Sequence, residues 1–253
     1  HGSLMGKTVT TLGEGFLDLL SPNCCCLCLM RCPGPIRLCR ACLSDIEVNT
    51  PCCPRCAIPM SVGEAQSEIV CAHCQQNPPR FDRALVPRLY EPPISQLISQ
   101  LKFGADAGIA NVLAELMAGI LANHLEQFRT PDFLVPMPLY WWRKMRRGFN
   151  QAELLAHALN IHPLLQHHAL RVNTKLCWRK HATRRQIDLS AAARSVNLKD
   201  AFACTPLSES PHIAIVDDIL TTGASANALA DSLYNAGAGR VDLWACARTP
   251  SPG

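Results

Sequence analysis

Residues 212–225 read HIAIVDDILTTGAS, and this stretch decides the fold. Residues 213–216 form a wholly apolar run, which is typical of a strand buried on both faces of a parallel sheet. Asp217 and Asp218 follow directly, where we expect the carboxyl end of the strand to meet solvent. The small and hydroxylic residues 221–225 then open a helical pattern. This consecutive order of strand, acids, loop and helix predicts an α/β fold.

The loop after the two acids has the composition of an anion-binding cradle. Backbone N–H groups, hydroxyl groups and the first turn of a helix together favour a phosphate group. Two carboxylates beside such a cradle can accept hydrogen bonds from the vicinal hydroxyls of a ribose. The alternative is a core strand that ends in an Asp-Asp turn, which the consecutive order disfavours. The predicted sugar-phosphate site comprises Asp217, Asp218, Thr221, Thr222, Gly223, Ala224 and Ser225.

At these residues the sequence resembles the type I phosphoribosyltransferases, whose signature for phosphoribosyl pyrophosphate (PRPP) has this form. The resemblance implies that the two acids orient the ribose and that residues 221–225 hold the 5-phosphate. It also implies a Mg²⁺ ion that bridges the pyrophosphate and the ribose hydroxyls, since magnesium favours substrate phosphates with few protein ligands.

The chain of 253 residues is long enough for one sizeable domain and a small one. Residues 1–3 read as a tag remnant and residues 12–20 as a short helix. The longest apolar run, residues 116–125, is too short to span a bilayer, and no export signal precedes it. We therefore expect a cytoplasmic protein without membrane insertion.

Cysteine is the most unusual feature of the composition, because 12 of the 15 cysteines fall between Cys24 and Cys74. Without an export signal, metal binding explains this density better than free thiols or disulfide bonds. Four Cys-x-x-Cys pairs can each form a knuckle, and two knuckles complete a tetrahedral site of four sulfurs for zinc. The predicted ligands of two structural zinc ions are Cys25, Cys28, Cys39, Cys42, Cys53, Cys56, Cys71 and Cys74.

The spacing favours sequential pairing of the knuckles, with 10 residues between the first two and 14 between the last two. Interleaved pairing satisfies the same spacing, and Cys24 or Cys26 can shift the first register by one residue. His73 lies inside the last knuckle, which Cys71 and Cys74 already complete. We assign residues 1–22 to the tag remnant and N-terminal helix, 23–77 to a double zinc ribbon, and 78–253 to the larger domain.

The larger domain continues the α/β pattern. A strand over residues 83–90 and two helical patterns are followed by a buried-type strand at residues 133–137, and residues 241–247 supply a last strand. His124, near the end of the second helical pattern, is expected at the surface. Residues 177–186 are basic and without periodicity, which indicates a mobile loop.

Positive charge is concentrated in one segment of the chain. Residues 141–199 contain 12 Lys and Arg against 2 acids, whereas the remainder contains 12 against 18. Within this segment a basic loop follows the strand at residues 133–137 and precedes a helix, and ligands of open parallel sheets bind at that edge. A solvated basic turn is the alternative. The predicted pyrophosphate loop contains Arg143, Arg147 and Asn150.

Several ordered motifs together narrow the resemblance. Strand-Pro-Leu, residues 147–151 (RGFNQ), residues 101–103 (LKF), the double zinc ribbon and the Asp-Asp motif are similar to the ComF family of phosphoribosyltransferase-like proteins, to which GntX also belongs. The resemblance implies a flexible loop that closes over PRPP and excludes water from the anomeric carbon. Its candidate residues are Arg184, Gln186 and Arg194.

Three functions are compatible with these patterns. The preferred one is a ComF-type PRPP-binding protein of natural transformation that handles single-stranded DNA or a helicase or DNA-uptake partner. The second is a catalytically active phosphoribosyltransferase of nucleotide metabolism, although no acceptor pocket is identifiable in the sequence and catalysis stays open. The third is a zinc-ribbon adaptor whose PRPP site only senses.

Overall fold

The computed structural model describes residues 24–32, 34, 36–61, 69–104, 106–140, 145, 148–180 and 200–250. The expected tag remnant and helix within residues 1–22 lie outside these residues. The boundaries of the three predicted segments stay predictions.

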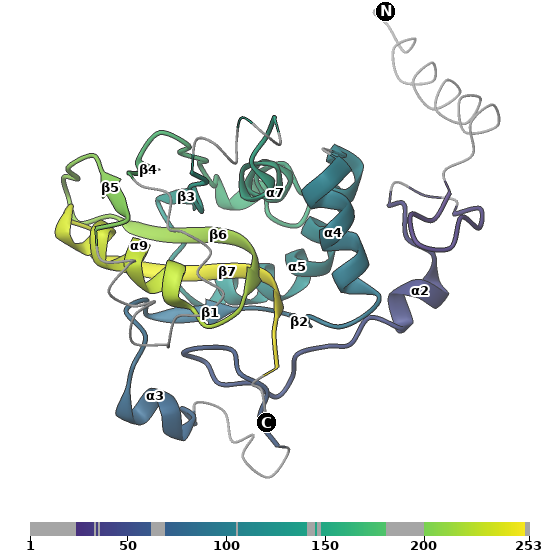
Figure 1. Ribbon diagram of the computed structural model, residues 1–253, viewed down its shortest axis with the longest axis horizontal. Helices are drawn as coiled ribbons and strands as arrows, with labels where there is room; N and C mark the ends of the chain where they lie inside the picture. The colour runs from purple at the N-terminus through teal and green to yellow at the C-terminus, as the bar shows by residue number, and fades with distance from the viewer. Residues whose placement is uncertain are drawn as a thin grey trace, which may run out of the picture.

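The larger part of the chain is built on a parallel sheet of five strands in the order β1-β7-β6-β3, with β2 also paired to β7 (Figure 1). The long neighbours β6 and β7 form its centre, in a register that aligns Asp217 with Ala245. The predicted parallel α/β sheet is thereby confirmed. The strands are β1 Arg83–Leu85, β2 Arg88–Leu89, β3 Phe133–Pro136, β6 His212–Leu220 and β7 Arg240–Arg248.

Helices cover both faces of this sheet, and the alternation along β6 shows why its sequence is apolar throughout. Ala214 and Val216 pack into a core with α4, α5 and α7, whereas Ile213 and Ile215 pack into a second core with α9. A strand buried on both faces needs apolar residues at every position. The helices are α4 Ile94–Gly104, α5 Ala107–Gln127, α7 Gln151–Asn160 and α9 Ala224–Asn235, with a short 3₁₀ helix η2 Gln166–His168.

Helix α5 is the one helix among the described residues that has the length and hydropathy of a membrane span. In the most apolar window of this helix, 61% of the residues are buried inside the protein. Leu113 and Met117 on this helix are fully covered and belong to the core beneath the sheet. The apolar composition of α5 therefore matches its place in the core.

Three local expectations were wrong. The predicted strand over residues 83–90 is divided into β1 and β2, and the interruption contains Pro87, which has no N–H to donate to a sheet. Strand β6 continues to Leu220, so the two acids lie within the strand and not after it. Residues 177–179 of the expected mobile loop form β4 (Cys177–Arg179), which pairs antiparallel with β5 (Phe202–Cys204).

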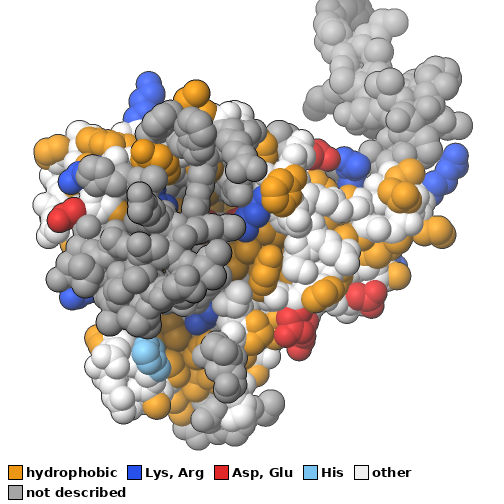
Figure 2. Space-filling model, viewed as in Figure 1, with side chains coloured by type: hydrophobic (Ala, Val, Ile, Leu, Met, Phe, Trp, Pro, Cys, Tyr) orange, Lys and Arg blue, Asp and Glu red, His pale blue; other side chains and the backbone are white. Residues whose placement is uncertain are grey.

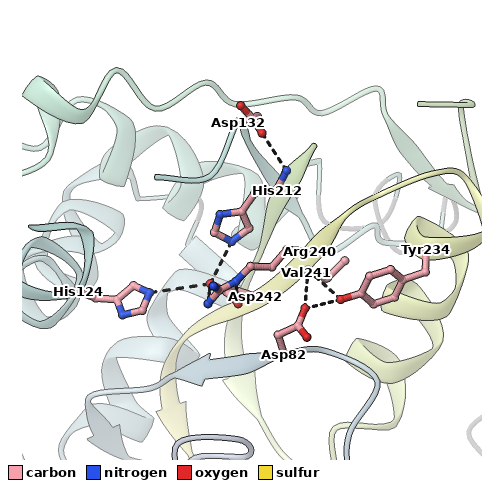
Figure 3. Close-up of polar contacts among 8 residues, drawn as sticks. All are labelled: Asp82, His124, Asp132, His212, Tyr234, Arg240, Val241 and Asp242. Atoms are coloured by element: carbon pink, nitrogen blue, oxygen red, sulfur yellow. Dashed lines mark hydrogen bonds and ion pairs between the residues drawn. The ribbon is translucent and has the colours of Figure 1, made fainter. Parts of the chain in front are cut away.

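His124 was expected at the surface, and this was also wrong, because its side chain is only 5% exposed. It lies at the amino-terminal edge of the sheet near Asp242, whose carboxylate also contacts His212 and Arg240 (Figure 3). His212 Nε2 lies 3.0 Å from Asp242 Oδ2, and Arg240 Nε donates to Oδ1 over 3.1 Å. Burial lowers the pKa of His124 to about 4, although the nearby Asp242 opposes this shift.

The cysteine-rich segments contact the larger domain in two separate places. The short helices α2 (Arg40–Ser44) and α3 (Ala72–Gln76) mark the two segments and lie on different sides of the molecule in Figure 1. The first segment packs beside α4 and α5, where Arg37 pairs with Asp106 over 3.0 Å. The second contacts the carboxyl ends of β6 and β7.

Candidate functional site

The eight predicted zinc ligands form two separate groups of four. We call them cluster 1 (Cys25, Cys28, Cys39, Cys42) and cluster 2 (Cys53, Cys56, Cys71, Cys74). Within each cluster all sulfur atoms lie within 4.8 Å of one another, so the structure shows the sequential pairing of knuckles. Cys24, Cys26 and His73 belong to neither cluster.

The distances within the clusters match a tetrahedral metal site. A zinc ion with Zn–S bonds of about 2.3 Å places its four sulfurs about 3.8 Å apart. The Sγ atoms of Cys28 and Cys39 are 3.7 Å apart, as are those of Cys56 and Cys71. Each cluster therefore has the geometry to hold one zinc ion.

The local backbone prepares some of these thiols for metal binding, because zinc binds the thiolate form. In cluster 2 the hydrogen bond from the Cys56 thiol lowers the pKa of Cys53 to about 4, against the effect of burial. In cluster 1 burial raises the pKa of Cys25, but hydrogen bonds from the backbone of Cys39 and Cys28 outweigh it and bring the value to about 6. Each cluster thus contains one thiol that loses its proton readily.

The predicted sugar-phosphate site lies at the carboxyl end of β6. Residues 219–226 together with Asp217 and Leu243 line a cavity of about 90 Å³. Ligand pockets usually have about 300–1,000 Å³, so this cavity suits one chemical group, such as a phosphate. The structure thus brings Asp217 together with residues 221–225, as the sequence analysis expected of a site for a phosphorylated sugar.

The amino terminus of α9 supplies donors to this cavity. Gly223 caps the helix with a φ of 76°, a conformation that favours glycine, and it has no side chain of its own to cap the first turn. The first N–H groups of a helix have no partner within the helix, and the helix dipole adds partial positive charge there. Thr222 Oγ1 accepts a weak hydrogen bond from Ala224 N over 3.4 Å. This helix end can therefore bind an anion.

The two adjacent acids do not share one environment. Asp217 lines the cavity, whereas the Asp218 side chain is 10% exposed and pairs with Lys102 over 3.0 Å. The N–H of Asp218 donates to Asp217 Oδ1 over 2.8 Å. Burial and the neighbouring Asp218 raise the pKa of Asp217 well above its ordinary value, and Lys102 opposes this shift. The Asp218 carboxylate therefore has a cationic partner within 3.0 Å, whereas burial disfavours the charged form of the adjacent Asp217.

This difference predicts opposite effects of two conservative substitutions on stability. Because the folded-state pKa of Asp217 is raised, its ionisation opposes folding at any pH above the ordinary pKa of about 4. We expect Asp217→Asn to raise Tm at pH 8 by about 2–4 °C, the shift that roughly 1 kcal/mol produces in a chain of this size. The gain should shrink as the pH falls to about 4 and vanish below that value, where both states carry a neutral group. Thermal unfolding at the two pH values measures it.

Asp218→Asn is the matched control, since it removes the charge that balances the half-buried Lys102. We expect this variant to lower Tm at pH 8, because Lys102 then loses its partner. A lower Tm for Asp217→Asn at pH 8 would contradict a raised pKa of Asp217 in the folded state.

The remaining predicted ligand contacts are described only in part. Arg143, Arg147, Arg184, Gln186 and Arg194 lie outside the described residues. Asn150 is 9% exposed and its side chain is engaged, since it caps α7 at Ala152 N and donates to Met137 O. It therefore fixes the junction between the basic loop and α7.

A larger cavity of about 390 Å³ lies between cluster 2 and the candidate site, and residues 220–223 line both cavities. Arg248, at the end of β7, crosses this junction. Its Nε donates to Cys56 O over 3.0 Å, and its Nη1 donates to Leu220 O and Thr221 O over 3.1 and 2.6 Å. Cluster 2 and the anion-binding loop are thus joined by one side chain.

The sequence analysis did not assign a role to Lys102 or Arg248. The LKF motif contains Lys102, but its partner Asp218 is distant in the sequence and no local pattern joins them. Arg248 binds backbone carbonyls, which have no sequence signature. The available signal was a cation directly after the apolar run of residues 243–247.

Comparison with known proteins identifies relatives over almost the whole chain, although no protein-family model matches. DNA utilization protein YhgH of Escherichia coli strain K12 is 34% identical over 234 residues, which cover 91% of this chain and 99% of that protein. Competence protein F of Haemophilus influenzae is 33% identical over 219 residues, 83% of this chain and 90% of that protein. Competence protein ComFC of Bacillus subtilis is 29% identical over 214 residues, 79% of each. The chain belongs to the ComF/YhgH family of competence proteins.

Proposed function

We propose that this protein binds PRPP with Mg²⁺ at Asp217 and residues 221–225 and handles incoming single-stranded DNA in the cytoplasm during natural transformation. One observation carries the PRPP assignment: Asp217 and the first turn of α9 line the same cavity. A phosphate on the helix terminus leaves the sugar hydroxyls within reach of the acid. Lys102 and Arg248 hold the surrounding groups in place.

The role in DNA handling is supported by the relatives, which carry the names DNA utilization protein and competence protein. Charge gives a second argument, because residues 141–199 contain 12 Lys and Arg against 2 acids. On the face shown in Figure 2, the described Lys and Arg side chains form separate patches and no continuous stripe. We assign DNA binding to the basic segment of residues 141–199, with a helicase or DNA-uptake protein as partner.

Two structural zinc ions complete the proposal, one in each cysteine cluster. Zinc in such sites supplies folding free energy to segments that have few apolar residues of their own. Cluster 2 contacts the anion-binding loop through Arg248, so its zinc would also support the site.

Calorimetry with PRPP and Mg²⁺ tests the proposal directly. We expect one PRPP per chain, and we expect Asp217→Ala combined with Asp218→Ala to abolish measurable binding, a loss of at least about 100-fold or roughly 2.7 kcal/mol. Zinc content, measured by mass spectrometry of the metal, should stay at two per chain. A double variant that folds, keeps its zinc and binds PRPP with native affinity refutes the ribose assignment.

DNA binding is tested separately from PRPP. If Arg184 and Arg185 contact phosphates, these two contacts alone should make the affinity for a single-stranded oligonucleotide fall by about sevenfold between about 50 and 200 mM salt. Replacing both by glutamine should lower the slope of log affinity against log salt concentration by about 1.4, because each phosphate contact in a single strand contributes roughly 0.7. The same calorimetric titration with the oligonucleotide present shows whether the two ligands compete. Binding without salt dependence would exclude an electrostatic DNA site.

An active phosphoribosyltransferase is the second candidate, and the 390 Å³ cavity beside residues 220–223 favours it, because it has the size of an acceptor pocket. This function predicts release of pyrophosphate from PRPP in the presence of a nucleobase or amine. An acceptor screen separates the two candidates. Absence of pyrophosphate release with every acceptor, while PRPP still binds, leaves the DNA-handling function.

A further inference from the structure

Cys177 and Cys204 face each other across the small antiparallel sheet of β4 and β5, with their Sγ atoms 2.7 Å apart. Neither belongs to cluster 1 or cluster 2. Cys177 is 6% exposed, whereas Cys204 is half-buried, so Cys204 is the more exposed residue of the pair. This pair of thiols has no part in the proposed function.

The strand register places the two cysteines in the geometry of a disulfide bond. Thr205 N donates to Leu176 O and Lys180 N donates to Ala201 O, and hydrogen-bonded pairs alternate along an antiparallel ladder. The pairs Leu176–Thr205 and Lys180–Ala201 are hydrogen-bonded, so the neighbouring pair Cys177–Cys204 is a non-hydrogen-bonded one. In such pairs the Cα atoms are about 4.5 Å apart. Disulfide bonds need about 4.4–6.8 Å between Cα atoms. The bond can therefore form without movement of the strands.

A third metal site does not account for these thiols. Clusters 1 and 2 are the only groups of three or more potential ligands within the described part of the chain. Two thiolates alone do not complete a zinc site.

The pair is also asymmetric in a way that suits thiol exchange. The hydrogen bond from Cys177 lowers the pKa of Cys204, against its burial, and Lys180 contributes in the same direction. The same hydrogen bond and burial raise the pKa of Cys177. Cys204 is thus both the more accessible sulfur and the better nucleophile.

We propose that Cys177 and Cys204 are a redox-active dithiol that forms a reversible intramolecular disulfide by exchange with a low-molecular-weight disulfide such as glutathione disulfide. The Cys204 thiolate attacks one sulfur of the oxidant, forms a mixed disulfide and releases one thiolate, which takes up a proton. Cys177 loses its proton, attacks Sγ of Cys204 and releases the second thiol. Two protein thiols are oxidised and one disulfide is reduced to two thiols.

Trypsin cleavage separates the two cysteines from all others. Cleavage after Lys175, Arg179, Lys199 and Arg240 gives the peptides 176–179 and 200–240, each with a single cysteine. We treat the zinc-loaded full chain with glutathione disulfide, block free thiols, and analyse the peptides without reduction. We expect the two peptides joined by one disulfide, and free again after treatment with dithiothreitol. Two peptides that stay separate, with both thiols blocked, overturn the proposal.

Serine variants test the order of the two steps. Cys177→Ser should trap one glutathione on Cys204, whereas Cys204→Ser should react at Cys177 at least about tenfold more slowly, because burial shields that thiol from the oxidant and disfavours its thiolate form. Cys246, which is fully buried and has no thiol partner among the described residues, is the internal control and should stay unmodified. Equal modification of Cys177 and Cys246 in wild-type protein would contradict a specific pair. The wild-type peptide analysis decides the proposal even if a variant fails to fold.

Discussion

Replacing Cys56 by serine is expected to remove the zinc of cluster 2, which lowers the zinc content from two to one, and to weaken PRPP binding by about tenfold, or roughly 1.4 kcal/mol. Cluster 2 then loses one of its four thiolates, and zinc binding of this kind contributes on the order of 10 kcal/mol to the fold of its segment. Metal analysis and calorimetry measure the two effects. We expect Cys56→Ser to cause a larger loss of local stability than the other single substitutions proposed for this protein.

The expected effect on PRPP follows from Arg248. Its guanidinium group binds the carbonyl of Cys56 on one side and the carbonyls of Leu220 and Thr221 on the other. When residues 53–56 unfold, Arg248 loses its hydrogen bond to Cys56 O. The guanidinium group is then less fixed in position, and so is the loop at Leu220 that it binds. The N–H groups of the helix terminus are then less well oriented toward a phosphate.

Cys28→Ser is the matched control, because Cys28 holds the equivalent position in cluster 1. Cluster 1 contacts the larger domain elsewhere, where Gln100 donates to Cys26 O and Arg37 pairs with Asp106. This variant should also lose one zinc, yet bind PRPP within about twofold of wild type. Equal loss of PRPP affinity in both variants would show that the effect is global unfolding and not the Arg248 contact.

Hydrogen exchange gives a readout that does not depend on PRPP. The amides of residues 220–225 should exchange faster in Cys56→Ser than in Cys28→Ser, since only the first variant disturbs the anchor of this loop. Unchanged exchange in Cys56→Ser would separate cluster 2 from the site.

The sequence allowed much of the fold to be predicted because the decisive patterns are local. Strands β6 and β7 are buried on both faces, so each appears as an apolar run. Helix α9 comes directly after β6, and its apolar residues recur at helical spacing. The cysteine knuckles could also be predicted, because each metal site is built from two short Cys-x-x-Cys motifs. Strand ends were less predictable: β6 continues through Asp217 and Asp218, since pairing with β7 extends beyond the apolar run.

Contacts between distant segments could not be predicted. His124 lies at the end of a helix and is buried 3.9 Å from Asp242, which belongs to the last strand. Lys102 and Asp218 come together only when α4 packs under the sheet, and the division of the two acids into different environments follows from that packing. The separate contacts of clusters 1 and 2 with the larger domain likewise depend on the tertiary structure.

Asp242→Ala is expected to destabilise the protein by about 1–3 kcal/mol, because it leaves the buried His212 ring without its hydrogen-bond partner. The Asp242 side chain is 1% exposed and binds His212 and Arg240, while His124 lies 3.9 Å away (Figure 3). Removing the carboxylate leaves Arg240 without a counter-charge and deprives His212 of its buried acceptor. Urea unfolding measures the loss as a lower midpoint at an unchanged slope.

Asp231→Ala provides the matched control, since Asp231 pairs with Arg80 over 3.4 Å and both side chains are more than half exposed. We expect a change of at most about 0.5 kcal/mol there. The pH dependence gives a sharper test of Asp242. Burial raises its pKa, but the bonds from His212 and Arg240 outweigh this and hold the value below its ordinary range. The stabilisation is therefore complete above pH about 4, the ordinary value for Asp, and is lost only as the pH falls through the lower folded-state pKa. The difference between wild type and Asp242→Ala should follow this course, and a difference that is already small at pH 7 would show that the buried carboxylate does not stabilise the sheet.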